Sequence, residues 1–203
     1  MTDHGDTDEP GGAEQGQTAG QPARPRHPVV QRGLYYDELD LDARYLHRPG
    51  RTVTEADNVL FSTLTMNPQA LHLDAAFAAS QPFGERLVNS MFTLATIVGA
   101  SVAQLTQGTT VANLGFGEVR FPHPLFPGDT LYSETMVEAK WLSRSRPGQG
   151  IVTFLHLGRN QEGTLVASAR RSALMWCRSA HEAAAGPDAA RASGPSSRPG
   201  EGA

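Results

Sequence analysis

Two short polar segments carry the side chains best suited to chemistry. Asn67-Pro68 forms a turn that leads to His72, and Asn89-Ser90 precedes a long run of apolar residues. Histidine readily gives or takes a proton near neutral pH, and the N–H groups at a helix start stabilise negative charge. Together the two segments predict acid/base chemistry on a carbonyl compound, with an oxyanion held at a helix N-terminus.

Each of these residues also has an ordinary structural interpretation. His72 can be a surface or core histidine bonded to a backbone carbonyl, and Asn67 can simply form the turn. Asn89 or Ser90 can cap the helix, which is compatible with a neighbouring N–H that faces a substrate. An amide orients water but takes up no proton at physiological pH. Base chemistry here therefore falls to His72 or to a carboxylate from elsewhere.

Motifs for metals and cofactors are missing from the sequence. None of the other six histidines has a partner at a spacing typical of metal ligands: His4, His27, His47, His123, His156 and His181. Cys177 is the only cysteine, so the chain can form no internal disulfide. There is no glycine-rich loop for phosphates or dinucleotides, and no nucleophile elbow. We predict no metal and no bound cofactor.

The composition excludes several classes of protein. The 203 residues carry a net charge of −4 with scattered lysine and arginine, which gives no basic footprint for nucleic acid. The acidic start Met1-Thr2-Asp3 lacks the apolar region of a secretory signal. The longest apolar stretch, 87–105, is interrupted by polar residues and is interpreted as a buried helix. We expect a cytoplasmic protein without a membrane span.

The chain divides into one folded domain and two tails. Residues 1–32 are rich in Gly, Pro and charged side chains, so they bury too little apolar surface to offset the entropy lost on ordering. Residues 179–203 are rich in Ala, Gly, Pro and Ser and are predicted to be disordered as well, although 180–190 can form a short helix. A single domain is expected at 33–178.

Within the domain, helical signals come first and strand signals follow. After a strand ending near Val53, the capping-box spacing that starts at Thr54 predicts a short helix at 55–65. Asp74 is placed to cap a second short helix, and 88–105 form a long one. Four strand-like patterns follow at 109–121, 130–142, 151–159 and 165–177. We predict an α+β fold in which an antiparallel sheet wraps around one long central helix.

Four motifs occur in the order typical of one known family, at 52–57, 71–74, 87–90 and 121–130. They resemble the MaoC-like dehydratases, which are hotdog-fold enzymes of the (R)-specific enoyl-CoA hydratase type. The resemblance covers 33–178, and the set of motifs is more specific than any one of them. It implies a single hotdog domain that acts on an acyl-CoA thioester.

Three segments, 64–72, 87–94 and 111–116, are similar to a subgroup that acts on branched C5-dicarboxylyl-CoA thioesters. This subgroup includes itaconyl-CoA hydratases and mesaconyl-CoA hydratases, also called β-methylmalyl-CoA dehydratases. The resemblance implies addition of water across a conjugated C=C, or the reverse, with citramalyl-CoA as the product from itaconyl-CoA. CoA then enters as part of the substrate rather than as a cofactor.

The sequence departs from the family pattern at two positions. The family aspartate, five residues before the histidine, is replaced by Asn67, and the family His-Gly at the central helix start is replaced by Asn89-Ser90. The resemblance then implies that Asn67 and His72 hold the water and that His72 moves the proton. The Ser90 N–H polarises the thioester carbonyl, a role that any non-proline residue can fill.

A dicarboxylyl substrate also needs a partner for its free carboxylate, and arginine suits one through its bidentate fork. Arg86 is the nearest arginine in sequence to the proposed site, with Arg51 and Arg120 behind it. Each of the three can equally be a solvated surface residue. Asn89, Arg86 and Gly115 complete the predicted substrate contacts.

Two other functions are compatible with the same fold. A thioesterase would release free thiol from acyl-CoA, and a non-catalytic subunit would bind acyl-CoA or an acyl carrier without turnover. A lone hotdog sheet has exposed edges and a half-formed pocket, so we expect at least a homodimer with sites near its interface. A trimer of dimers is also open.

Overall fold

The computed structural model describes residues 29–185 of the chain. Its elements follow in the order η1 (Tyr36–Glu38), β1 (Arg44–Thr52), α1 (Glu55–Leu64), α2 (Ala70–Leu73), α3 (Ala75–Ala79), α4 (Ser90–Leu105), β2 (Thr110–Arg120), β3 (Thr130–Leu142), β4 (Gln149–Arg159), β5 (Leu165–Trp176) and α5 (Arg178–Ala185). The predicted α+β class is confirmed, and the predicted strands after α4 agree with β2 to β5 within two residues at each end.

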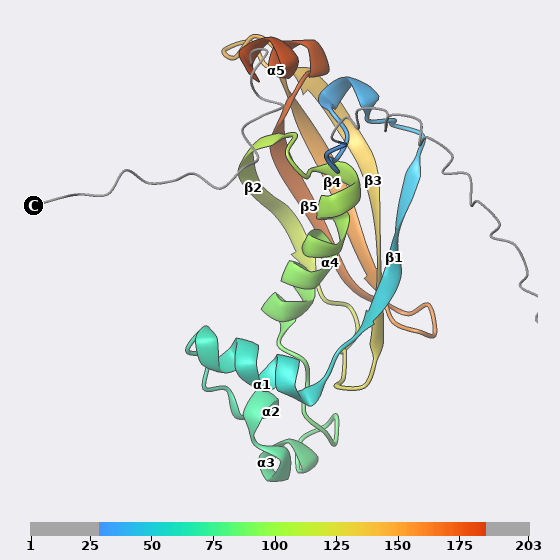
Figure 1. Cartoon of the computed structure of the whole chain (residues 1–203). Helices are drawn as coiled ribbons and strands as arrows, with labels where there is room; N and C mark the ends of the chain where they lie inside the picture. Colours follow the sequence, from blue (N-terminus) through green and yellow to red (C-terminus); the bar gives the residue numbers. More distant parts are fainter. Residues whose placement is uncertain (1–28, 186–203) are drawn as a thin grey trace, which may run out of the picture.

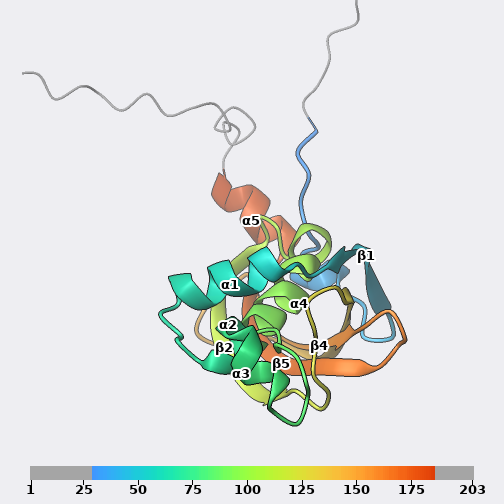
Figure 2. The ribbon, with the colours of Figure 1, turned by 90° about the horizontal axis from the view of Figure 1, so that it is seen from below.

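The five strands form one antiparallel sheet in the order β1-β3-β4-β5-β2. Strands β3, β4 and β5 make the predicted meander, whereas β2 pairs with β5 at the far edge. Helix α4 lies along one face of the sheet, and a view from below shows the sheet curving around it (Figure 1, Figure 2). The predicted sheet around one long central helix is therefore confirmed.

Burial of apolar side chains holds helix α4 against the sheet. Its 16 residues include no charged side chain, and Ile97 and Leu105 are fully buried. Each such side chain contributes about 1.5–3 kcal/mol by burial. Gly158 in β4 allows the close approach, because a Cβ there would lie 2.6 Å from Cγ2 of Ile97. The sheet thus fixes the position of the helix whose first turn was predicted to bind the oxyanion.

The N-terminal segment fastens the other end of α4. The Gly33 N–H donates to the Gln107 carbonyl at 2.7 Å, and the Leu34 N–H donates to the Leu105 carbonyl at 3.1 Å. A helix C-terminus leaves its last carbonyls without partners inside the helix, and the bond from Leu34 satisfies that of Leu105, the last residue of α4. A Cβ on Gly33 would meet the Thr106 nitrogen at 2.4 Å, so only glycine fits this crossing.

Local capping signals account for the short helices. Thr54 and Asp57 form the predicted capping box at the start of α1, and the bond from the Thr54 backbone lowers the pKa of Asp57. The Phe77 N–H donates to Asp74 at 2.9 Å, as predicted for the start of α3. Helix α2 was not predicted. His72 therefore lies on a single helical turn rather than in an open loop.

The C-terminal boundary differs from the prediction. Residues 179–185, which were assigned to the tail with only a frayed helical turn expected at 180–190, form helix α5 together with Arg178. His181 explains why this helix docks on the domain, since its ring stacks on Trp176 at 5.3 Å between centroids and its Nδ1 lies 3.2 Å from the Tyr35 hydroxyl. The expected tails at 1–28 and 186–203 lie outside the described residues.

A chain of polar side chains runs from Gln104 on α4 to three buried residues of the sheet, His47, Thr135 and His156. The Gln104 amide oxygen accepts from His47 Nδ1 at 2.8 Å, so His47 Nε2 accepts from the Thr135 hydroxyl, also at 2.8 Å. Thr135 in turn accepts from Nδ1 of His156 at 2.9 Å. Nε2 of His156 is therefore a buried acceptor without a hydrogen-bond partner among the described residues. Nη1 of Arg171 is a buried donor that also lacks a partner among them.

This buried chain makes the stability of the fold depend on pH. Burial is the main cause that lowers the pKa of His156 from 6.5 to about 3, and the charge of Arg171 adds to it. The pKa of His47 is lowered as well, mainly by burial. The unfolded chain binds these protons more tightly than the folded protein does. The contribution of the two neutral histidines to the free energy of unfolding is therefore fully present above pH 6.5, and it is lost as the pH falls from 6.5 toward 3.

We expect the free energy of unfolding, measured by urea titration, to drop by on the order of 2 kcal/mol between pH 7 and pH 5. His156→Gln removes the largest contribution, so its stability should change less over this interval. A variant profile as steep as that of the unaltered protein would contradict the assignment.

Candidate functional site

One hydrogen bond orients His72. Its Nδ1 lies 2.9 Å from the Leu87 carbonyl oxygen, which can only accept, so Nδ1 carries a proton. In the neutral ring, Nε2 then holds the lone pair, and it has no hydrogen-bond partner among residues 29–185. The side chain is half-buried. His72 is therefore held in the tautomer that a general base requires.

The side chain of Asn58 joins the three segments that form the site. Its amide nitrogen donates to the carbonyls of His72 at 3.2 Å and Leu87 at 3.0 Å, and its oxygen accepts from the Asn89 N–H at 2.9 Å. Asn58 lies within α1 and is 1% exposed. All of its bonds go to backbone groups, so it fixes the turn of His72 against the start of α4.

The start of α4 combines ordinary capping with a free donor. Asn89 is the N-cap: its side-chain oxygen accepts from the Met91 N–H at 3.0 Å, and its amide donates to the Ser62 hydroxyl at 3.2 Å. No acceptor for the Ser90 N–H is present in the described part of the chain. The capping and oxyanion interpretations of Asn89-Ser90 are therefore compatible, because Asn89 caps the helix while the backbone N–H of Ser90 remains available as a donor.

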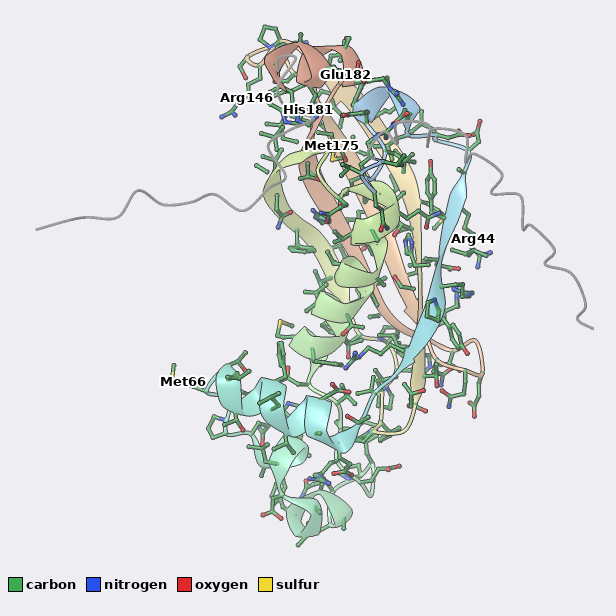
Figure 3. All side chains as sticks on the ribbon, in the orientation of Figure 1. Arg44, Met66, Arg146, Met175, His181 and Glu182 are labelled. Carbon is green, nitrogen blue, oxygen red and sulfur yellow. The ribbon has the colours of Figure 1, made fainter. Side chains whose placement is uncertain are left out.

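Asn67 stands at a constrained turn. Its side-chain oxygen accepts from the Gln69 N–H at 3.1 Å, as in a turn-forming asparagine. Met66, just before it, has φ 53°, which is uncommon for a residue other than glycine, and its side chain points outward at the end of α1 (Figure 3). No hydrogen bond between Asn67 and His72 is found within the described region.

Two cavities are lined by neighbours of the predicted site residues, and the side chain of His72 itself lines neither of them. One, of about 210 Å³, is lined by Ser90 and by Leu87, whose carbonyl accepts from His72. The other, of about 330 Å³, is lined by Asn67 and by Leu73, the neighbour of His72 in the chain. The structure thus gathers His72, Asn89 and Ser90 through Asn58, but it places Asn67 in a separate cavity from Ser90.

The remaining predicted site residues lie apart from these cavities. Arg86 forms an ion pair with Glu55 at the start of α1 and lines neither cavity. Gly115 lies in edge strand β2, at an irregularity in its pairing with β5, with φ 137°. It too is absent from both linings. Among the described residues, no group of three potential metal ligands is present.

Sequence reasoning missed two residues near the site. Asn58 lies within a helix, where nothing in the local pattern distinguishes a buried asparagine from an exposed one. His123 was set aside because it has no partner in sequence, yet it lines the 210 Å³ cavity with Ser90. Its place between Pro122 and Pro124, in a loop that follows β2, was the available signal.

Solved structures with the same architecture identify the fold. A protein of Mycobacterium tuberculosis described as having a double hotdog fold matches with a TM-score of 0.64 and 24% identity, over 71% of this chain and 44% of that one. A monoamine oxidase regulatory protein from Archaeoglobus fulgius matches with a TM-score of 0.66 and 30% identity, over 73% of this chain and 98% of that one. The described domain is a hotdog fold.

The family follows from the sequence match. The MaoC like domain model matches residues 38–158, so the chain belongs to the MaoC-like domain family. Mesaconyl-CoA hydratase of Cereibacter sphaeroides is 30% identical over 137 residues, which cover 67% of this chain and 39% of that enzyme. The chain spans about a third to two fifths of the length of such relatives.

None of the described helices is long and apolar enough to cross a bilayer.

The central position of Asn58 can be tested by stability measurements. Asn58→Ala removes bonds to three buried or half-buried backbone groups, and we expect the free energy of unfolding to fall by about 1–3 kcal/mol. Asn58→Asp should be worse at pH 7, because its carboxylate would face two carbonyl oxygens, and it should recover partly in acid as the carboxyl gains a proton. Unchanged stability of Asn58→Asp at pH 7, measured by urea titration, would disprove this role.

Proposed function

We propose that the protein is an enoyl-CoA hydratase or dehydratase whose substrate is a branched C5-dicarboxylyl-CoA. The observation that carries the proposal is the pairing, through Asn58, of an oriented His72 with a helix start whose Ser90 N–H has no acceptor within residues 29–185. Family membership supports the reaction class, and the likeness to mesaconyl-CoA hydratase supports the substrate class. In this reaction water adds across the conjugated C=C of the thioester.

The proton path uses His72 alone. In its neutral form, Nε2 takes a proton from water while the hydroxide adds to the β-carbon of the enoyl group. The electron pair of the C=C moves toward the thioester, and the imidazolium returns its proton to the α-carbon. The Leu87 carbonyl accepts from Nδ1 in both charge states, so the ring keeps its orientation throughout. In each turnover one water molecule adds across one double bond, and His72 ends in its neutral form.

Two further groups support this step. The Ser90 N–H donates to the thioester oxygen as negative charge develops there, and one such donor contributes roughly 3 kcal/mol to lowering the barrier. Asn67 uses its oxygen in its own turn, which leaves its amide N–H groups to hold the attacking water. Asn67 and Ser90 line different cavities, so a substrate that contacts both must extend from one cavity to the other and bring its reacting group to Nε2 of His72.

A panel of assays tests which reaction the protein catalyses. Mesaconyl-, itaconyl- and crotonyl-CoA are offered while enoyl absorbance and free thiol are followed together. We expect absorbance to fall without release of thiol. Release of thiol would instead show a thioesterase, and binding without any turnover would show a non-catalytic subunit.

The same assay tests the histidine. In His72→Gln, kcat should fall by about 10²–10⁴, because the general acid/base is removed while Asn58 still holds the turn. His181→Gln, which alters the docking of α5 at the other end of the molecule, serves as the matched control and should keep its activity (Figure 3). Normal turnover by His72→Gln would exclude the mechanism.

We also propose that the working unit is at least a homodimer. Strand β2 is a sheet edge with unpaired backbone groups and carries Leu114 and Phe116, which are 50% and 42% exposed. Helix α4 leaves a stripe of small or apolar side chains uncovered at Met91, Ala95, Gly99 and Ala103. A second copy that covers both would bury this surface. Sedimentation velocity should therefore give a dimer or larger, and a monomer at micromolar concentration would contradict it.

A further inference from the structure

We propose that His123 determines substrate specificity by binding the free carboxylate of a dicarboxylyl-CoA. This inference rests on the proposed function, because it assumes that the thioester carbonyl lies at the Ser90 N–H. Its own observation is independent: His123 and Ser90 line the same cavity, although they are 33 positions apart in the sequence.

The cavity is built from four parts of the fold. The segment before α4 contributes Leu87, the first turns of α4 contribute Ser90 and Thr93, the loop between β2 and β3 contributes His123, and the start of β5 contributes Val166. Most of the other lining side chains are apolar. A short acyl group that leaves Ser90 therefore meets hydrophobic walls with His123 as a polar end group.

The dimensions suit a short dicarboxylyl chain. A sphere of 210 Å³ is about 7 Å across, a size below that of typical drug-sized ligand pockets. In a mesaconyl or itaconyl group, the carboxylate carbon lies about 4 Å from the thioester carbon and its oxygens about 5 Å away, given C–C bonds near 1.5 Å. A carboxylate attached to a thioester at Ser90 can therefore reach the opposite wall of the cavity, whereas a long acyl chain exceeds it.

The imidazole of His123 is positioned to act as a donor. The Leu165 carbonyl oxygen accepts from its Nδ1 at 3.0 Å, which directs Nε2 away from β5. Pro122 and Pro124 restrict the backbone on both sides. In the imidazolium form, one ring N–H donates to the Leu165 carbonyl and the other can donate to a bound carboxylate. The carboxylate gains a charge-assisted bond from a nearly fixed donor.

The arginines expected to fill this role are otherwise engaged. Arg86 pairs with Glu55, Arg51 with Asp57 and Arg120 with Glu118. None of the three lines the cavity with Ser90. Among the residues that do line it, His123 is the only one whose side chain can carry a positive charge. A carboxylate that leaves water for this largely apolar lining gains from such a partner at its exposed rim, where His123 stands.

The proposal is tested by binding, which requires no turnover. Glutaryl-CoA and pentanoyl-CoA have acyl chains of the same length, and only the first ends in a carboxylate. By calorimetry, the unaltered protein should bind glutaryl-CoA at least about 10-fold more tightly, as one charge-assisted hydrogen bond provides. In His123→Leu this preference should shrink to about 2-fold or less, and His123→Arg should restore it.

The matched control is Arg146→Gln, which removes an exposed cation at the opposite end of the molecule and should keep the preference (Figure 3). Thermal unfolding of each variant shows that the fold is retained. A preference that survives in His123→Leu, or that the unaltered protein lacks, overturns the proposal. If the preference depends on His123 but no enoyl-CoA is hydrated, the carboxylate site stands and the hydratase function fails.

Discussion

The site depends on one buried amide. Asn58 uses both ends of its side chain to bind backbone groups of three segments that are far apart in sequence, and none of these bonds reaches solvent. A hydrogen bond between buried groups contributes little net free energy to folding. Removing one partner is costly, because each buried group left unpaired destabilises the fold by about 1–3 kcal/mol. The same residue that stabilises the α1–α4 contact therefore also sets where His72 stands.

The sheet supplies the second constraint, because it fixes α4 and with it the direction of the helix N-terminus. Ile97 packs against Gly158 in β4, and Leu105 is held under the segment that begins at Gly33. An oxyanion donor works only when it is aimed before the charge develops, so rigid placement of this helix is a requirement of the proposed chemistry. Burial of apolar surface and orientation of the Ser90 N–H are in this way two results of one packing arrangement.

Local patterns made most of the fold predictable, and contacts between distant segments explain what was missed. The capping box at Thr54, the cap at Asp74 and the apolar run of α4 are all encoded within a few residues, and each was predicted. The pairing of β2 with β5, the helix at 179–185 and the role of Asn58 depend on contacts across the fold. A role for His123 was not predicted because the residue with which it shares a cavity, Ser90, is distant in the sequence and close only in the folded structure.

Asn67, at the position of the aspartate in the family pattern, leaves His72 as the single acid/base group of the proposed mechanism. With two acid/base groups, one can stay ionised while the other donates, but with one group the same nitrogen must accept a proton and then return it. That requires a ring whose position is independent of its charge. A backbone carbonyl meets this need, because it accepts from Nδ1 whether the ring is neutral or cationic, whereas a carboxylate partner would favour the cation. The Leu87 carbonyl, itself bonded to Asn58, is thus the partner that a single-histidine mechanism calls for.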